Sequence, residues 1–312
     1  MFTLPAYPNS MRRYKLTLLI GMIVAAIIVD SCKTKFETAP ANFKATITPE
    51  AIARGKVLVF SSCAGCHYDR SVNKLIGTPI HDVPGIVGKV YSANLTNSKT
   101  NGRPPQYSDA QLKYLLKTGI NKDGRFIPYM LRPNLADEDV NAIIAYLRSN
   151  DAAVAAADTT IGLTHYNIIG KIYMGATAKP LPYNPGIKMP INDVAMGKYL
   201  VDNLGCFHCH SQSLQKLNYL AIEQSKGYLA GGIKFKDEKG NTVIASNITV
   251  DKNTGIGNFT KAQFLKAVKD GEAPNRKLHP PMPKFDRLSD KEIDAIYSYL
   301  QTVPAVYHNV HG

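Results

Sequence analysis

The chain has 312 residues and a formal net charge of +13 at pH 7, with 45% hydrophobic and 20% charged residues. This length allows two ordinary domains, since domains cluster near ~100–150 residues, and the composition is that of a folded globular protein. The positive charge favours acidic protein partners or anionic lipid headgroups; because the lysines are scattered and no nucleic-acid-binding module is recognisable, we expect no nucleic-acid partner.

Residues 1–31 have the pattern of an export signal. The cationic "RRYK" of residues 12–15 precedes the 14-residue run "LTLLIGMIVAAIIV" of residues 16–29, and "DSCK" follows it. A positive stretch, a short apolar run and a small residue before the cut are typical of a signal peptide, and the run is shorter than the ~20 residues that span a bilayer. We predict a signal peptide at 1–31, with translation from Met1 or Met11, and an N-terminal tether at 32–47.

Cys32 occupies the position at which bacterial lipoproteins carry their acylated cysteine. Ser31 is small, as expected there, whereas Asp30 departs from the usual small or apolar residue. Lipidation would explain a cysteine without a neighbouring partner in an exported chain, and a diacylglyceryl-type group would meet the need for more than one acyl chain. We predict a lipid anchor at Cys32 on the periplasmic side of a bacterial membrane; an uncleaved anchor and a simple secretory cut are the alternatives.

Most of the remaining chain contains an internal repeat with a period of roughly 150 residues. Two copies of about a hundred residues indicate tandem domains, not a solenoid. We predict domain 1 at 48–150, a linker at 151–191, domain 2 at 192–304 and a C-terminal tail at 305–312. The matching segments are 53–67 with 195–210, 92–96 with 246–249, 107–119 with 259–271, and 135–149 with 288–302.

Both copies are predicted to be helical. Val140, Ile143, Ile144 and Leu147 follow the i, i+3, i+4, i+7 spacing of an amphipathic helix, and the equivalent residues of the second copy do the same. Helix starts are indicated by Thr48 before Pro49 and by the capping box of Ser289 with Glu292. The proline-rich linker predicts an extended strap between the domains. The expected fold class is therefore all-α, with two tandem helical domains.

Each copy carries one C-x-x-C-H motif, the attachment pattern of c-type haem. The motifs are Cys63-Ala-Gly-Cys66-His67 and Cys206-Phe-His-Cys209-His210. Two thiols one helical turn apart can add to the two vinyl groups of a porphyrin edge, and the next histidine can then reach the iron. We expect His208, inside the second motif, to lie on the surface.

Two other sites begin with paired cysteines. A structural zinc site usually has four ligands close together, whereas these pairs lie more than a hundred residues apart in separate copies. A redox-active pair needs a thioredoxin-like βαβ context, which the sequence lacks. The motifs therefore predict two covalently bound haem c groups, with His67 and His210 as iron ligands.

Met130 and Met282 are the methionines that occupy equivalent positions in the two copies, and a proline precedes each within two residues. Proline keeps such segments out of helix, which suits a loop that crosses the far face of a haem. A methionine is otherwise a core filler, and this interpretation holds for Met174, Met189 and Met196. We predict Met130 and Met282 as the second iron ligands; His279 is a rival in the second copy, where the first copy has Ile127.

The sequence resembles class I c-type cytochromes in tandem, and in particular the dihaem cytochrome c subunits of membrane-bound alcohol, gluconate and sugar dehydrogenases. The resemblance covers residues 48–304 and rests on both C-x-x-C-H motifs, "SNITVDKNTGIGNFTKAQF", "HPPMP" and "SYLQTVP". Many members carry three haems, and this sequence has two attachment motifs.

The resemblance implies a role for several further residues. It implies close packing of the first helix, at Gly55 and Gly197, against Tyr146 and Tyr299 of the last helix. Asn94, Thr96, Asn247 and Thr249 are candidates to bind haem propionates or, alternatively, simply form turns.

The predicted function is electron transfer, with no catalytic residues. Histidine–methionine ligation raises the haem potential and leaves no open position on the iron. The expected partners are an electron-donor dehydrogenase and an electron-acceptor oxidase or cytochrome of the respiratory chain, with acidic docking surfaces. The alternative is a dihaem enzyme, a peroxidase or sulfur-compound oxidase, with one exchangeable axial ligand.

Overall fold

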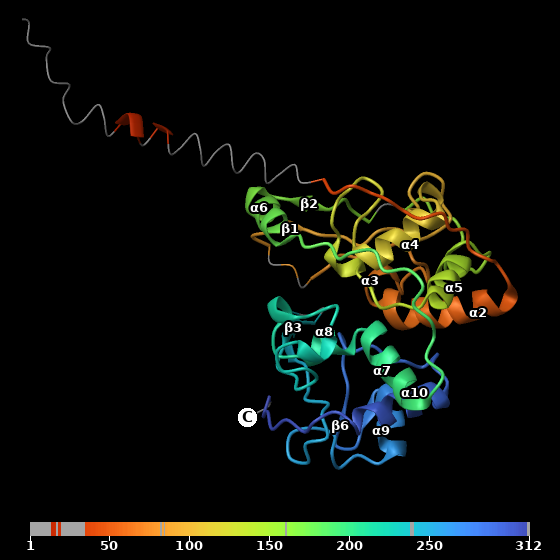
Figure 1. Cartoon of the computed structure of the whole chain (residues 1–312), viewed down its shortest axis with the longest axis vertical. Coiled ribbons are helices and arrows are strands. Elements are labelled where there is room, and N and C mark those ends of the chain that lie inside the picture. Colours follow the sequence, from red (N-terminus) through yellow and green to blue (C-terminus); the bar gives the residue numbers. More distant parts are fainter. Residues whose placement is uncertain are drawn as a thin grey trace, which may run out of the picture.

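The computed structural model of the chain describes residues 14–16, 18–19, 35–81, 83, 85–159, 161–237 and 240–310. Cys32, Met1, Met11 and most of the predicted export signal lie outside these residues. The described part consists mainly of short helices joined by long loops (Figure 1). The predicted helical class is confirmed, with a few short strands in addition.

The helices form two equivalent sets, one in each copy of the repeat. In Figure 1 the set of the first copy lies above that of the second copy. The first set is α2 (Pro49–Leu58), the π-helical turn Val59–Cys63, α3 (Ala64–His67), α4 (Asp109–Thr118) and α5 (Asp137–Leu147). The second set is α7 (Asp193–Asn203), α8 (Cys206–His210), α9 (Lys261–Asp270) and α10 (Asp290–Leu300).

The strands of the described part are two or three residues long and form three separate antiparallel pairs. Each pair connects two loop segments by hydrogen bonds, and the strands form no larger sheet within the described residues. The pairs are β1 (Gly88–Lys89) with β2 (His165–Tyr166), β3 (Lys234–Lys236) with β4 (Thr242–Ile244), and β5 (Glu272–Ala273) with β6 (Arg276–Lys277).

The helix boundaries follow local signals that the repeat preserves. The Thr48 side chain caps α2 by accepting from the Ala51 amide at 3.1 Å, as predicted. Helices α4 and α9 both begin with a capping box and end at a glycine with positive φ, Gly119 at 75° and Gly271 at 76°. The predicted capping box at Ser289 is also confirmed. Both copies therefore encode their helix ends locally.

The first and last helices of each copy cross at a glycine. A Cβ atom on Gly55 would lie 1.9 Å from the carbonyl oxygen of Ala142 and 2.7 Å from the Tyr146 Cβ. In the second copy a Cβ on Gly197 would lie 1.9 Å from the carbonyl oxygen of Ala295. Only glycine permits this approach, so the predicted packing of α2 on α5 and of α7 on α10 is confirmed.

The segment between the copies differs from the expected extended strap in its first part. Strand β2 pairs with β1 of the first copy, and residues Ile168–Thr177 form helix α6. A Cβ on Gly170 of this helix would lie 2.0 Å from the carbonyl oxygen of Val87, so α6 packs closely against the first copy. Residues 178–191 contain no helix or strand, as predicted. They lie along α5, where the Asp137 amide donates to the Ile187 carbonyl at 2.9 Å.

The residues that follow the last helix of the first copy also belong to its folded body. The Leu75 amide donates to the Ala153 carbonyl at 2.9 Å, and the Asn97 amide donates to the Val154 carbonyl at 2.7 Å. Val154 is fully buried. The folded body of the first copy thus extends several residues into the segment predicted as linker, because these residues complete the hydrogen bonds of its loops. Among the described residues, no helix is long and apolar enough to cross a membrane.

The glycine crossing leads to a test of stability. Gly55→Ala should destabilise the protein by about 3 kcal/mol or more, because the new methyl group overlaps a backbone carbonyl that cannot move without separating α2 from α5. Gly85→Ala is the control, since a Cβ there meets nothing within 4 Å, and it should change stability by less than about 1 kcal/mol. Chemical denaturation of both variants measures the difference; equal stabilities would contradict the packing argument.

Candidate metal centres

The first motif lies where α2 runs through the π-helical turn into α3. Cys63 ends the turn, and Cys66 and His67 lie on α3. His67 is buried, and burial lowers its pKa, so the imidazole is neutral. Its Nδ1 lies 2.7 Å from the Ala93 carbonyl oxygen. A carbonyl can only accept, so Nδ1 carries the proton and Nε2 is left with a lone pair for a metal.

The second motif repeats this arrangement on α8. His210 is buried with a lowered pKa, and its Nδ1 lies 2.7 Å from the Ser246 carbonyl oxygen. Ala93 and Ser246 occupy equivalent positions in the repeat. Each copy thus holds one histidine in the tautomer and orientation that a metal ligand requires.

The two copies place their cysteines differently, although the helix crossings are equivalent. Cys63 is eight residues after Gly55, whereas Cys206 is nine residues after Gly197. The first copy reaches its motif through the π-helical turn without interrupting the helix. The second copy breaks the helix at Gly205, which has φ 86°. The second copy therefore accommodates its extra residue at Gly205, a glycine with a left-handed backbone that has no equivalent in the first copy.

None of the four motif cysteines forms a disulfide within the described residues. Burial raises the pKa of Cys63 to about 11 and that of Cys206 to about 12. Within the described residues, no group of three histidine, cysteine, aspartate or glutamate side chains could hold a metal ion.

Met130 and Met282 lie in equivalent turns. The Met130 amide donates to the Ile127 carbonyl at 3.0 Å, and the Met282 amide donates to the His279 carbonyl at 3.1 Å. Both methionines are half-buried against the core. His279 remains exposed but also lines the cavity described next. Met189 and Met196 pack against the core, in agreement with their predicted role as fillers.

A single cavity of about 3480 Å³ receives the predicted ligands of both copies. It is several times larger than the ~300–1,000 Å³ of ordinary ligand pockets. The residues of both C-x-x-C-H motifs that face it, with Met130 and Met282, combine thiols, imidazoles and thioethers in an otherwise mainly apolar lining. This donor set fits haem c. The lining includes Cys63, Cys66, His67, Met130, Cys206, Cys209, His210 and Met282.

The asparagine–threonine pairs of the two copies serve as turns. The Asn94 Oδ1 accepts from the Thr96 amide at 2.8 Å, and the Asn247 Oδ1 accepts from the Thr249 amide at 2.9 Å. The side-chain nitrogens of the two asparagines donate to carbonyls of the segments that follow the last helices. The Asn94 Nδ2 lies 2.9 Å from the Ala157 carbonyl oxygen, and the Asn247 Nδ2 lies 2.7 Å from the Val306 carbonyl oxygen. These contacts favour the turn-forming alternative over propionate binding.

His208 is half-buried, although it was expected to be exposed on the surface. Its ring lies 4.1 Å from the Phe207 ring and 5.3 Å from the Tyr219 ring, measured between centroids. Burial, helped by the charge of Arg132, lowers its pKa to about 3. The reason is tertiary: Tyr219 approaches from the loop that follows the motif, and Arg132 approaches from the other copy. The motif alone predicts neither contact.

Arg132 is a candidate functional residue that sequence reasoning missed. It follows the Met130 turn and lines the cavity. Its Nη1 donates to the Leu131 carbonyl at 2.8 Å, while its buried Nε has no hydrogen-bond partner in the described part of the chain. Its charge opposes the effect of burial on the pKa of Cys63 and adds to it at His208. The charge of Arg132 thus acts on a residue of each motif. In the sequence, its position two residues after Met130 was the feature that could have identified it as a candidate.

An acidic side chain lies one turn before the second motif. Asp202 is 7% exposed, and its Oδ2 accepts from the Lys198 Nζ at 2.7 Å. The same Nζ lies 2.8 Å from Glu223. Burial raises the pKa of Asp202 to about 6, although Lys198 acts in the opposite direction.

Comparison with known proteins relates the first copy of the repeat to c-type cytochromes. Residues 52–151 match the family model described as Cytochrome c, which implies a covalently bound haem c. The chain is 29% identical to the fructose dehydrogenase cytochrome subunit of Gluconobacter japonicus, over 82% of this chain and 53% of the relative. It is 26% identical to the gluconate 2-dehydrogenase cytochrome c subunit of Pantoea cypripedii, over 81% of this chain and 60% of the relative.

A third relative is the cytochrome c subunit of alcohol dehydrogenase (quinone) from Komagataeibacter europaeus, with 24% identity over 78% of this chain and 54% of the relative. The resemblance to cytochrome c subunits of dehydrogenases is therefore confirmed. The chain spans between about half and three fifths of the length of these relatives.

The raised pKa of Asp202 predicts a pH-dependent stability. Between pH ~4 and ~6 the folded protein holds a proton that the unfolded chain releases, so the free energy of unfolding falls as pH rises through this window. Asp202→Asn should remove this component and gain about 2 kcal/mol relative to wild type between pH 4 and pH 7. Denaturation at both pH values measures the gain. Glu223→Gln, at a carboxyl with a lowered pKa, should not reproduce it; parallel curves for wild type and Asp202→Asn would contradict the burial argument.

Proposed function

We propose that the chain is a dihaem electron carrier made of two tandem cytochrome c domains, each with one haem held between a histidine and a methionine. The observation that carries the proposal is the repeated histidine geometry: His67 and His210 are both buried, and both donate from Nδ1 to equivalent carbonyl oxygens at 2.7 Å. Met130 and Met282 line the same cavity from equivalent turns. The proline-rich segment 178–191 connects the domains.

Each bound haem would supply a one-electron iron couple. The four cysteines would fix the porphyrins covalently, and the buried histidines would present Nε2 to the metal. The methionine thioethers favour the reduced state of the metal more than a second imidazole would, which raises the potential. The mainly apolar lining would keep water away from the metals, and the positive charge of Arg132, which also lines the cavity, would oppose their oxidation.

We infer the donor class from the relatives, which are cytochrome subunits of fructose, gluconate and alcohol dehydrogenases. The chain would accept electrons from a dehydrogenase of this kind and pass them to an oxidase or another cytochrome. The net charge of +13 supports docking to acidic surfaces on both partners. Export to the periplasm and a lipid anchor at Cys32 complete the proposal.

A pyridine haemochrome assay with a spectroscopic redox titration tests the function. We expect two c-type haems per chain, both low-spin, with the methionine–iron charge-transfer band in the oxidised protein. A high-spin component or rapid binding of carbon monoxide would indicate an open iron position. That result would favour the dihaem peroxidase or sulfur-compound oxidase over the electron carrier.

The assignment of the second ligand leads to a variant test. Met282→His should lower the potential of one haem by more than ~59 mV, a tenfold change in the one-electron equilibrium, and should abolish its charge-transfer band. The other haem should keep its potential within the error of the titration. Met189→His is the matched control, because Met189 is also half-buried against the core, and it should shift neither potential. Equal shifts of both haems would contradict two separate haem sites.

A further inference from the structure

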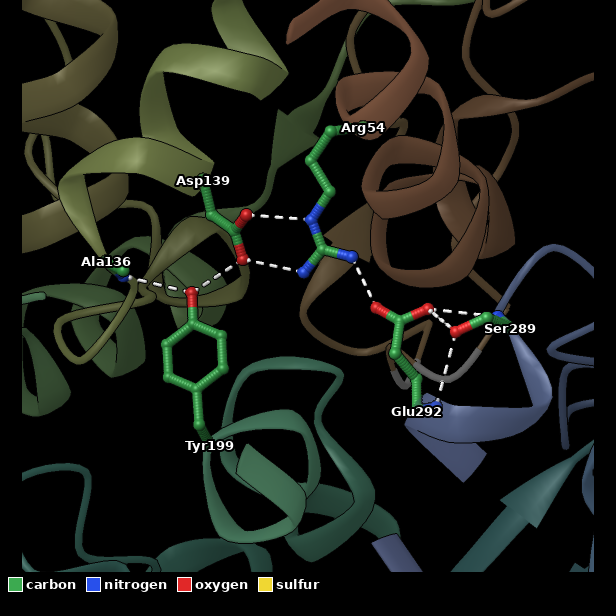
Figure 2. A network of polar contacts seen from close by, with 6 residues as sticks. All are labelled: Arg54, Ala136, Asp139, Tyr199, Ser289 and Glu292. Atoms are coloured by element: carbon green, nitrogen blue, oxygen red, sulfur yellow. Dashed lines mark hydrogen bonds and ion pairs between the residues drawn. The ribbon is translucent and has the colours of Figure 1, made fainter. Parts of the chain in front are cut away.

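The two copies of the repeat are joined by a buried polar network that involves four helices (Figure 2). Arg54 of α2 donates from Nε and Nη2 to both carboxylate oxygens of Asp139 on α5, at 2.9 and 3.0 Å. Its remaining Nη1 donates to Glu292 on α10 of the second copy. From α7 of the second copy, the Tyr199 hydroxyl donates to Asp139 Oδ2 at 2.8 Å. One guanidinium thus binds a carboxylate from each copy.

The two carboxylates are equivalents in the repeat. Asp139 and Glu292 both occupy the third position of the last helix, in "LADEDV" and "LSDKEI". In the second copy, Glu292 closes a capping box by accepting from the Ser289 amide at 2.9 Å. Glu292 therefore serves its own helix and the contact with Arg54 at the same time.

The first copy cannot close this box, because Ala136 stands where the second copy has Ser289. Helix α5 accordingly begins without a side-chain cap of its own. The Ala136 amide instead donates to the Tyr199 hydroxyl of the second copy at 3.0 Å. Figure 2 shows the hydroxyl between this amide and the Asp139 carboxylate. The second copy thus supplies the acceptor for the Ala136 amide, the bond that Glu292 makes to the equivalent Ser289 amide in its own helix.

Both residues that make these contacts stand where the copies differ. Arg54 in "ARGK" corresponds to Met196 in "AMGK", and Tyr199 corresponds to Val57. The flanking glycines and lysines are the same in both copies. The network is largely shielded from solvent, since the side chains of Asp139, Glu292 and Arg54 are 3%, 19% and 26% exposed. A buried charge pair of this kind tolerates one arrangement and penalises others that leave a charge unpaired.

The same contact surface brings the two motifs toward each other. Ser62, next to Cys63, donates to the Asn203 carbonyl at 3.4 Å, and Asn203 precedes Cys206 by three residues. Asn134 of the first copy donates to the Tyr219 carbonyl at 3.0 Å, beside His208. Whatever fixes the contact between the copies therefore also fixes the separation of the two motifs.

We propose that Arg54 and Tyr199 are positioning residues for electron transfer between the two haems: they lock the two copies into one orientation and so hold the haem edges at one separation. This inference rests on the proposed dihaem function. Because electron tunnelling weakens steeply with distance, a locked contact gives a single fast transfer step. A contact without the network would sample longer separations and slow it.

The test uses the holoprotein, with Arg54→Met and Tyr199→Phe. The first variant introduces the residue of the second copy, and the second removes one hydroxyl group. A laser flash with a flavin photoreductant reduces one haem, and absorbance then follows transfer to the other. We expect a rate constant at least tenfold lower, or several phases, in Arg54→Met and a smaller decrease in Tyr199→Phe. The potentials and axial-ligand spectra of both haems should match those of wild type.

Lys56→Met is the matched control. Lys56 also lies on α2, and its Nζ is 2.6 Å from Asp151, but this ion pair stays within the first copy. The variant should keep the wild-type rate. If Arg54→Met does not fold, Tyr199→Phe decides the question alone.

A wild-type inter-haem rate in Arg54→Met and Tyr199→Phe would overturn the inference, since the network would then serve stability only. A single haem per chain in the wild-type haemochrome assay would instead overturn the proposed dihaem function itself. The haemochrome assay on the wild-type protein tests the dihaem function, and the inter-haem rates of the variants test the role of the network. The two failures therefore give different results.

Discussion

The approach of two backbones at a glycine is the constraint on which each copy depends. Where Gly55 meets the carbonyl of Ala142, the first and last helices come closer than any side chain allows. Since α2 continues directly into the first motif, this crossing determines where the motif emerges. Gly197 has the same role for α7. The position of each predicted haem site thus follows from a contact that involves no haem ligand.

Local signals explain why so much could be predicted from the sequence. Caps, glycine stops and the C-x-x-C-H motifs act over a few residues, and their repetition gave each prediction an internal check. Helix α6 and strand β2 escaped prediction because β2 is stabilised by pairing with β1, about 75 residues earlier. His208 and Arg132 escaped because each owes part of its surroundings to the other copy, through the effect of the Arg132 charge on His208. Periodicity and spacing contain no information on such contacts.

The differences between the copies are as informative as the similarities. The second copy has a left-handed glycine before its motif, at Gly205, and a self-contained cap on its last helix. The first copy has a π-helical turn before its motif and no side-chain cap on its last helix. The missing cap is compensated by Tyr199 of the second copy, which accepts from the Ala136 amide. The copies therefore share a framework but differ in how each holds its motif and its last helix.

Because its last helix lacks a cap, the first copy depends on the second copy for a contact that the second copy does not need in return. An uncapped helix start leaves amide groups unsatisfied, and burying them without partners is unfavourable. In α5 the Ala136 amide is satisfied by Tyr199, so the first copy depends on the second for a bond that the second makes for itself. Arg54 extends the dependence, since its guanidinium is shared between Asp139 and Glu292. Separating the copies would remove the partner of the Ala136 amide and the contact of Arg54 with Glu292. Asp139 would keep its bonds from Arg54, and Glu292 would keep its bond from Ser289. The duplicated architecture therefore behaves as one unit, in which the cavity that receives both motifs has a defined shape.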